Sequence, residues 1–232
     1  MKKVGIIGAM ELEVEALKEK MEIHRRMEKA SMEFLEGKLN NTPAVIVRSG
    51  IGKVNAAVCA QILCDSFEVS HIINTGVAGS LKNEINIGDI VVSTDALHHD
   101  VDVRVFGYPL GEVPQMGCLA FRADQHLAQL AVSCCKEVNP DIGVYRGRIV
   151  SGDQFISDKQ VKEDIIRNFQ GYCVEMEGAS IAHTAYLNRV PFVIIRAISD
   201  KADDSAQMDY PSFEKAAAAH SARLVEHMLP EI

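Results

Sequence analysis

The sequence lacks the features that mark membrane proteins and nucleic-acid-binding proteins. No apolar run in the 232 residues approaches the length of a membrane span, which is about 20 residues. Lys and Arg are spread along the chain without forming a stripe, and the net charge is -8. Because nucleic-acid phosphates are bound by a basic face, these absences exclude both a membrane and a nucleic acid from the expected partners.

The six cysteines contain no C-x-x-C pair. Cys59 and Cys64 fall on one apolar, helix-like run, and Cys134 and Cys135 fall on another. We therefore expect buried, reduced thiols, as in a cytosolic protein. The opening M-K-K-V-G-I-I-G run is too short for the core of a signal peptide, which also predicts a cytoplasmic location.

The composition, with 47% hydrophobic and 24% charged residues, is that of an ordinary globular protein. Periodicity predicts strands at 3–8, 70–76, 89–94, 144–151 and 192–198, a hairpin at 32–39 and 44–49, and helices at 10–22, 53–67, 122–138, 159–169, 178–188 and 212–228, the last capped by Ser212. Strands alternating with helices, with a hairpin inserted, predict a single α/β domain over residues 1–232. Its architecture is three-layer α/β/α around a central mixed β-sheet.

The most informative segments are V-E-M-E-G-A-S at 174–180 and R-A-I-S-D at 196–200. The second follows a strand that is apolar on both faces, so ionisable groups reach the edge of a covered core. Burying a charge is costly unless it is paired or used. Arg196 could form a structural ion pair with Glu177 or Glu175, or these groups could belong to an active site.

The first predicted strand ends in G-I-I-G-A-M and leads directly to Glu11 and Glu13. The G-x-G-x-x-G pattern of dinucleotide-binding folds is absent, and an acid in the first helical turn would repel a pyrophosphate, so a nicotinamide-dependent dehydrogenase is disfavoured. A carboxylate at this position suits the activation of water, although acids are also common in first turns. The S-G-I-G-K run at 49–53 lacks the spacing of a phosphate loop.

Three further strand ends carry polar or glycine-rich residues. Residues 74–80, N-T-G-V-A-G-S, could present backbone N–H groups to a ligand or form a structural turn. Residues 98–102, H-H-D-V-D, have no partner motif for a metal, and a loop that meets water or a neighbouring subunit is the better interpretation. Phe155 in S-G-D-Q-F-I could stack on a flat ring or cap the core.

Together these segments resemble the 5′-methylthioadenosine/S-adenosylhomocysteine nucleosidases, within the wider nucleoside phosphorylase family. The resemblance runs from Lys3 to about Met228. It rests on the motifs already quoted and on H-D-V-D-V at 99–103 and F-G-Y-P-L-G-E-V-P at 106–114. It implies hydrolysis of an N-glycosidic bond to adenine, in methionine salvage and methyl-cycle recycling, with no cofactor and no metal.

The resemblance also implies a role for individual residues. Glu13 corresponds to the base that activates water and Asp200 to the acid that protonates adenine N7. Glu177 would hold the ribose hydroxyls beside the Met176 backbone, while Arg196 would help to place the water. The remaining substrate contacts are implied at Gly79, Phe155, Ile156, Ser199 and Val77, and in a 5′-alkylthio pocket at Met10, Ile51, Met208 and Tyr210. A loop reaching the neighbouring subunit of a homodimer would carry Val103, Phe106, Tyr108 and Pro114.

One position departs from the family pattern, since many members have Ser where this chain has Val77. Without that hydroxyl, placement of the water would depend more on Glu13 and Arg196. Phosphorolysis is the nearest rival reaction, but a phosphate would need cationic donors where Glu13 stands. A nucleoside-binding protein without turnover would need the pocket but not both Glu13 and Asp200. The sequence does not rank methylthioadenosine, S-adenosylhomocysteine, 5′-deoxyadenosine or a futalosine-type nucleoside as substrates.

Overall fold

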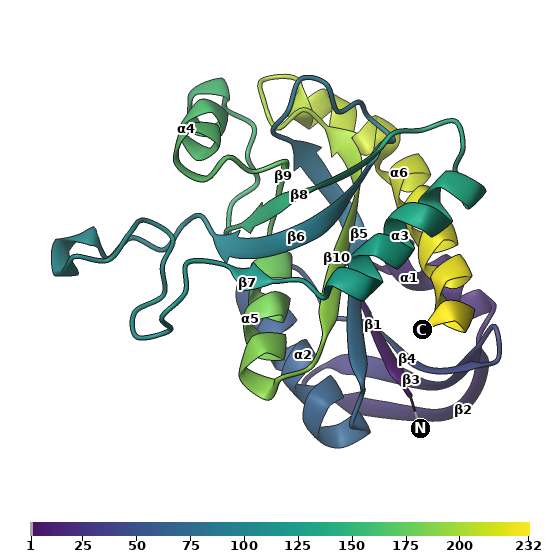
Figure 1. The fold of residues 1–232 in the computed structure, drawn as a ribbon. Helices are drawn as coiled ribbons and strands as arrows, with labels where there is room; N and C mark the ends of the chain where they lie inside the picture. Colours follow the sequence, from purple (N-terminus) through teal and green to yellow (C-terminus); the bar gives the residue numbers. More distant parts are fainter. Residues whose placement is uncertain (1) are drawn as a thin grey trace.

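In the computed structural model, which describes residues 2–232 except for the side chain of Met208, a mixed β-sheet forms the centre of the fold (Figure 1). Its strands are β1 Val4–Gly8, β2 Glu22–Lys29, β3 Met32–Leu39, β4 Thr42–Arg48, β5 His71–Ser80, β6 Ile90–His98, β7 Phe121–Arg122, β8 Val144–Ser151, β9 Cys173–Glu175 and β10 Phe192–Asp200. The order is β10-β6-β8-β9-β5-β1-β4-β3-β2, and β7 pairs with β6. Because β5 also pairs with β10, the strands β5, β10, β6, β8 and β9 close into a barrel-like circuit.

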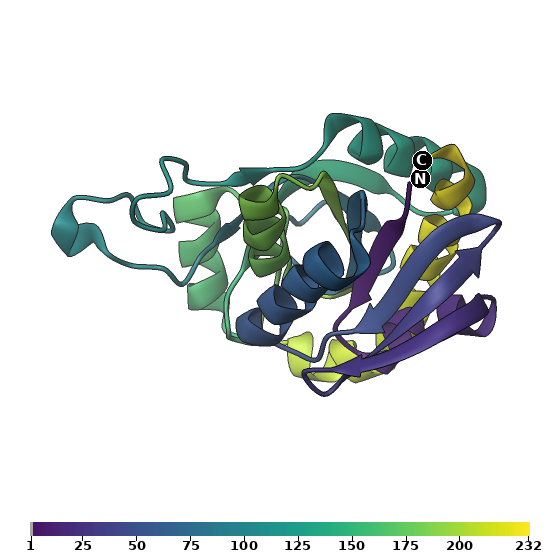
Figure 2. The same cartoon turned by 90° about the horizontal axis from the view of Figure 1, so that it is seen from below.

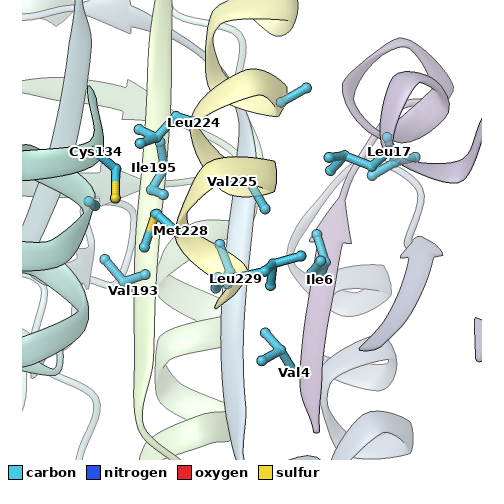
Figure 3. Packing of buried hydrophobic residues seen from close by; sticks show 14 of the residues in the cluster. Val4, Ile6, Leu17, Cys134, Val193, Ile195, Leu224, Val225, Met228 and Leu229 are labelled. Atoms are coloured by element: carbon cyan, nitrogen blue, oxygen red, sulfur yellow. The ribbon is translucent and has the colours of Figure 1, made fainter. Parts of the chain in front are cut away.

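Helices cover both faces of this sheet (Figures 1 and 2). One face carries α1 Glu11–Glu19, α3 Gln125–Val138 and α6 Ala206–Met228, and the other carries α2 Lys53–Phe67 and α5 Gly178–Asn188. Ile6 of β1 packs into the first layer and Ile7 into the second, which is the pattern of a strand covered on both sides. Figure 3 shows the first layer, where Leu224, Val225 and Met228 of α6 pack over the sheet. The predicted three-layer α/β/α fold is confirmed.

Side-chain caps explain where two of the helices begin. The carboxylate of Asp124 accepts the Leu127 N–H at 2.9 Å before α3. The carboxylate of Asp158 accepts the Val161 N–H at 2.9 Å before α4, Lys159–Phe169. Each cap satisfies an N–H that has no partner within its helix. The predicted bounds of α2, α4, α5, β3 and β8 agree with those observed.

Several predicted bounds were wrong. The helix predicted at 10–22 ends at Glu19, and residues 22–29 form β2, an edge strand exposed along most of its length. The helix predicted at 122–138 begins only at Gln125, after β7. The last helix begins at Ala206 with Ser205 as N-cap, so Ser212 lies inside it. Proline usually marks a helix boundary, and the predicted helix began just after Pro211. In the structure Pro211 is accommodated within the helix.

An arm projects from the body between β6 and β7, with the short 3₁₀ helix η1, Arg104–Phe106, at its tip (Figures 1 and 2). A second 3₁₀ helix, η2 Leu229–Glu231, follows α6. The side chains of Val105 and Phe106 are 85% and 76% exposed. None of the helices within residues 2–232 combines the length and the apolar character of a membrane span.

Candidate active site

A cavity of about 400 Å³ opens where β1, β5 and β10 reach their carboxyl ends. This is the usual position of ligands in open α/β sheets. It is lined by Ala9, Met10, Glu13, Ile51, Val77, Ala78, Gly79, Phe155, Val174, Glu175, Met176, Glu177, Ser199, Asp200 and Tyr210. The lining is therefore mainly apolar, with four carboxyl groups among it, those of Glu13, Glu175, Glu177 and Asp200.

Glu13 lies in the first turn of α1 with its side chain turned back toward the sheet. One carboxylate oxygen accepts the N–H groups of Ala9 and Met10, at 2.6 and 2.9 Å, and the other accepts the Val77 N–H of β5 at 3.0 Å. Burial raises the pKa of Glu13, while the charge of Arg196 and these backbone donors oppose the rise. Glu13 is thus fixed in direction and is a weaker acid than a free glutamic acid.

Asp200 ends β10 and lines the same cavity. Its carboxylate accepts the Ala202 N–H at 2.7 Å and the Ser199 hydroxyl at 2.9 Å. Burial raises its pKa, against the effect of those two hydrogen bonds. Asp200 pairs with Gly79 of β5, where an added Cβ would lie 2.7 Å from the Asp200 Oδ1 atom. Glycine is therefore required at position 79 for this close approach.

Arg196 lies beneath the cavity and pairs with Glu175. Its Nε donates to the Glu175 Oε2 atom at 3.2 Å, its Nη2 contacts the same oxygen, and Nη2 also donates to the Asn74 side chain at 2.6 Å. Glu175 further accepts the N–H groups of Glu177 and Gly178. Burial alone would raise the pKa of Glu175, but Arg196 and these hydrogen bonds hold it below the ordinary value. The structural ion pair considered from the sequence is present, with Glu175 as its main partner.

Glu177 interacts more weakly with Arg196 than Glu175 does. Its Oε2 atom is 4.0 Å from the Arg196 Nη2 atom, and its Oε1 atom accepts the Gly52 N–H at 2.8 Å. Burial, together with the neighbouring Glu175 charge, raises the pKa of Glu177. Glu175 and Glu177 therefore differ in acidity, because Arg196 makes its close contacts with Glu175.

The other end of the cavity is apolar and aromatic. The rings of Phe155 and Tyr210 meet edge to face with their centroids 5.6 Å apart. The Tyr210 hydroxyl donates to the Met10 sulfur at 3.3 Å. A smaller space of about 40 Å³ adjoins, lined by Ile156 and Gln154 together with residues of the main cavity. Phe155 is half exposed, so it stands at an opening and is not a core cap.

Most predicted site residues meet in this one cavity. Those lining it or its adjoining space are Met10, Glu13, Ile51, Val77, Gly79, Phe155, Ile156, Met176, Glu177, Ser199, Asp200 and Tyr210. Arg196 lies one layer behind the lining and Met208 falls outside the described side chains. The arm residues Val103, Phe106, Tyr108 and Pro114 are not part of the lining.

The prediction missed Ala9, Ala78, Val174 and Gln154 as lining residues, and it considered Glu175, which also lines the cavity, only as an ion-pair partner of Arg196. The small or apolar side chains of Ala9, Ala78 and Val174 carry no chemical signal, although Ala9 and Ala78, like Gln154, adjoin predicted residues in the sequence. His98 and His99 are buried, and burial lowers the pKa of each. Over the described part of the chain no group of histidine, cysteine and acidic side chains could hold a metal ion.

The chain is similar to known proteins along nearly its whole length. Residues 3–230 match the family model described as the phosphorylase superfamily. A 5′-methylthioadenosine/S-adenosylhomocysteine nucleosidase of Exiguobacterium sp. is 48% identical over 96% of this chain and 95% of that protein.

Two solved structures extend the comparison. The Neisseria meningitidis 5′-methylthioadenosine/S-adenosylhomocysteine nucleosidase, in complex with methylthio-immucillin-A, is 40% identical, covers all of both chains and superposes with a TM-score of 0.96. The futalosine hydrolase of Helicobacter pylori is 33% identical over 100% of this chain and 98% of that one, with a TM-score of 0.94. The chain therefore belongs to the phosphorylase superfamily and, within it, to the 5′-methylthioadenosine/S-adenosylhomocysteine nucleosidases.

Proposed function

We propose that the protein is an N-glycosyl hydrolase that releases adenine from 5′-methylthioadenosine and S-adenosylhomocysteine. The observation that carries this proposal is a pair of carboxyl groups, Glu13 and Asp200, with raised pKa values in one cavity. Glu13 is tied to Val77 and Asp200 is paired with Gly79, two residues further along β5. A strand advances about 3.3 Å per residue, so these anchor points lie roughly 7 Å apart. The two carboxyl groups are therefore anchored at different points of the same cavity, as separate roles for an acid and a base require.

Each of the two groups suits one half of the reaction. Adenine is a poor leaving group until its N7 atom is protonated, and the raised pKa of Asp200 favours the protonated form that can donate. Water must attack the opposite face of the sugar and lose a proton, for which Glu13 in its ionised form is the base. Bond breaking runs through an oxocarbenium-like state, and Glu177 lies where a carboxylate would stabilise its positive charge.

The remaining lining divides between the base and the 5′ substituent. In this assignment Phe155 stacks on adenine, and the backbones of Ile156 and Gly79 contact the base. Glu177 and the Met176 backbone hold the ribose hydroxyls, and Ser199 supports Asp200. Met10, Ile51 and Tyr210 receive the alkylthio group, for which a mainly apolar pocket is well suited. Because the adenosine part is shared, 5′-deoxyadenosine is also a substrate, and no cofactor is needed.

The charge of the cavity favours hydrolysis over phosphorolysis. Among the described residues that line it there is no lysine or arginine, and the Arg196 guanidinium is engaged by Glu175 and Asn74. A phosphate nucleophile would need such cations, and it would meet the Glu13 carboxylate instead. Val77 contributes its backbone N–H to Glu13 but no hydroxyl to an oxyanion.

A futalosine-type nucleoside is the second candidate substrate. The likeness to the Helicobacter pylori futalosine hydrolase supports it, since that enzyme shares the fold at a TM-score of 0.94. Ile51, 53% exposed, and Phe155, 50% exposed, stand at an opening, so a larger 5′ substituent could extend outward. The likeness to nucleosidases is closer in sequence, so methylthioadenosine and S-adenosylhomocysteine remain the first choice.

A two-fold homodimer would complete the site. Exposed apolar side chains gather on the α2 and α5 face, with Val54, Val58, Tyr186 and Leu187 among them. The projecting arm adds Val105 and Phe106, and through Val103, Phe106, Tyr108 and Pro114 it would reach the cavity of the other subunit. Apolar patches of this kind are typical of protein interfaces, and a two-fold dimer is the commonest homo-oligomer.

We place the reaction in the cytoplasm, as part of methionine salvage and methyl-cycle recycling. All six cysteines are free, and burial raises the thiol pKa of Cys59, Cys64 and Cys173. Buried thiols without disulfides fit a reducing compartment.

Product analysis tests the proposed reaction. Release of the base from methylthioadenosine, S-adenosylhomocysteine, 5′-deoxyadenosine and a futalosine-type nucleoside should proceed equally in phosphate-free and phosphate buffers, with a free sugar as the second product. A sugar 1-phosphate would refute hydrolysis.

Asp200→Asn and Glu13→Gln should each lower kcat by about 10²–10⁴-fold with substrate affinity nearly unchanged, whereas Glu177→Gln should also weaken binding. Binding without turnover by the wild-type protein would indicate a sensor.

A further inference from the structure

Lys162 is a buried lysine on the apolar side of a helix. It shares the buried stripe of α4 with Ile165 and Phe169, at the spacing of one helical face. Only 7% of its surface is exposed, and among the described residues it is the one lysine that is buried. Lysines are almost never buried unless they are paired, so this position requires a partner.

The partners of Lys162 lie in the loop between β10 and α6. Its ammonium group donates to the Lys201 carbonyl oxygen at 2.5 Å and to the Asp203 carboxylate at 3.3 Å. Asp203 in turn accepts the backbone N–H and the hydroxyl of Ser205, the N-cap of α6, at 3.1 and 2.9 Å. One ammonium group therefore holds both the residue that follows Asp200 and the start of α6.

This loop sets the direction of the Asp200 carboxyl group. Ala202, between the two partners of Lys162, is fully buried with a φ of +51°. That left-handed conformation is uncommon for a residue other than glycine and persists only when the surroundings hold it. It directs the Ala202 N–H at the Asp200 Oδ1 atom. Ala202 also packs in one cluster with Ile165 and Phe169, so α4 supports the loop by apolar contact as well.

The segment before α4 carries other lining residues of the cavity and its adjoining space. Phe155 and Ile156 precede the helix, and Asp158 caps it. Lys162, one turn into α4, is thus a link between the Phe155–Ile156 wall and the Asp200 loop. The lysine is absent from the lining of the cavity and has no direct contact with the space that a substrate would occupy.

We propose that Lys162 is a positioning residue for the acid step, holding the Lys201–Asp203 loop so that Asp200 points at the leaving group. The inference rests on the proposed role of Asp200 as general acid. Without the ammonium group, the Lys201 carbonyl and the Asp203 carboxylate lose their shared donor. The left-handed Ala202 can then relax, and the Asp200 carboxyl group loses its fixed direction.

A double-mutant cycle on methylthioadenosine tests this link. Lys162→Met keeps the buried apolar stem and removes the charge, and Lys159→Met, at the exposed first position of the same helix, is the matched control. Lys162→Met should lower kcat by about 10- to 100-fold, since a misplaced acid loses part of its typical 10²–10⁴-fold contribution, with KM changed by less than about 3-fold. Lys159→Met should match the wild type.

The decisive comparison is made in the Asp200→Asn background. If Lys162 acts through Asp200, the double variant should be no slower than Asp200→Asn alone, because the acid is already lost. A further drop equal to that of Lys162→Met in the wild type would refute the positioning role and leave the proposed function intact. Near-wild-type turnover by Asp200→Asn would instead refute the proposed function itself.

Circular dichroism and thermal unfolding should show all four variants folded. If Lys162→Met does not fold, Lys162→Gln, which keeps a donor of shorter reach, takes its place in the same cycle. A Lys162 variant with wild-type kcat, or one in which only KM rises, would also overturn the inference.

Discussion

The substitution Gly79→Ala should displace the Asp200 carboxyl group while leaving the protein folded, so that the effect of its position on the rate can be measured. A Cβ at this position would lie 2.7 Å from the Asp200 Oδ1 atom and 2.7 Å from the Ala202 Cβ atom. Ordinary contacts between such atoms are about 3.5–4.0 Å, so a shift of roughly 1 Å is required. Misplacement of about 1 Å at a reacting group can cost about 10²-fold in rate. We expect kcat for adenine release to fall by about that factor.

The cost to folding should be modest. Gly79 is not among the glycines with positive φ, so alanine can adopt its backbone conformation. Overpacking typically costs about 1–3 kcal/mol, and about 1 kcal/mol lowers Tm by roughly 2–4 °C in a chain of this size. Tm measured by calorimetry should therefore fall by several degrees without loss of the folded state.

Gly5→Ala is the matched control. Gly5 lies in β1, also has no positive φ, and its added Cβ would meet the Leu63 Cδ1 atom at 3.0 Å, away from the cavity. It should lower Tm to a similar or smaller extent and leave kcat unchanged. Wild-type kcat in a folded Gly79→Ala protein would refute the reasoning, because it would show that Asp200 needs no fixed direction.

Three further predictions concern charge and assembly. The pH profile of kcat/KM should be bell-shaped. Its acid limb should lie at a higher pH than for a free glutamic acid, because Glu13 must be ionised to act and burial raises its pKa, and its alkaline limb should be set by Asp200, which must be protonated. A profile that is flat across both limbs would contradict these roles. Arg196→Met should lower the free energy of unfolding by about 3–5 kcal/mol, because it leaves the buried Glu175 charge unpaired. Arg26→Met, at an exposed ion pair, should lower it by less than about 1 kcal/mol. Chemical unfolding measures both values. Phe106→Ala, at a side chain 76% exposed, should weaken dimerisation in sedimentation experiments and raise KM with Tm nearly unchanged, and a fully active wild-type monomer would exclude the shared site.

The sequence predicts the fold wherever burial leaves a periodic pattern. Strand β8 and helix α5 carry apolar residues on the faces that the core covers, and their predicted bounds are confirmed. Strand β2 was missed because it pairs only with β3 and is exposed along most of its length, so its pattern holds no alternation of buried and exposed residues. The start of α6 was missed because Pro211 within a helix contradicts local propensity, and packing against the sheet overrides that propensity.

The sequence identifies the candidate site residues more completely than their partners. Glu13 is recognisable from its place after a glycine-rich strand end, but its contact with the Val77 N–H joins residues that are distant in sequence. Glu175 and Glu177 are equivalent candidates for Arg196 in the sequence. They differ only because β9 ends at Glu175, which turns that side chain toward Arg196, while Glu177 precedes α5 beside Gly52. Such assignments depend on tertiary geometry that no local pattern contains.

The charge balance around Arg196 connects the fold with the proposed reaction. Three buried carboxyl groups, Glu13, Glu175 and Glu177, interact with this single guanidinium. Glu175 takes the direct contacts, and burial raises the pKa of the other two. When all three are ionised, the site carries more negative charge than its one cation balances. A neutral nucleoside does not relieve this excess, whereas an oxocarbenium-like sugar does. In the proposed reaction, the ionised site would therefore stabilise the oxocarbenium-like transition state more than the neutral substrate, as catalysis of glycosidic bond cleavage requires.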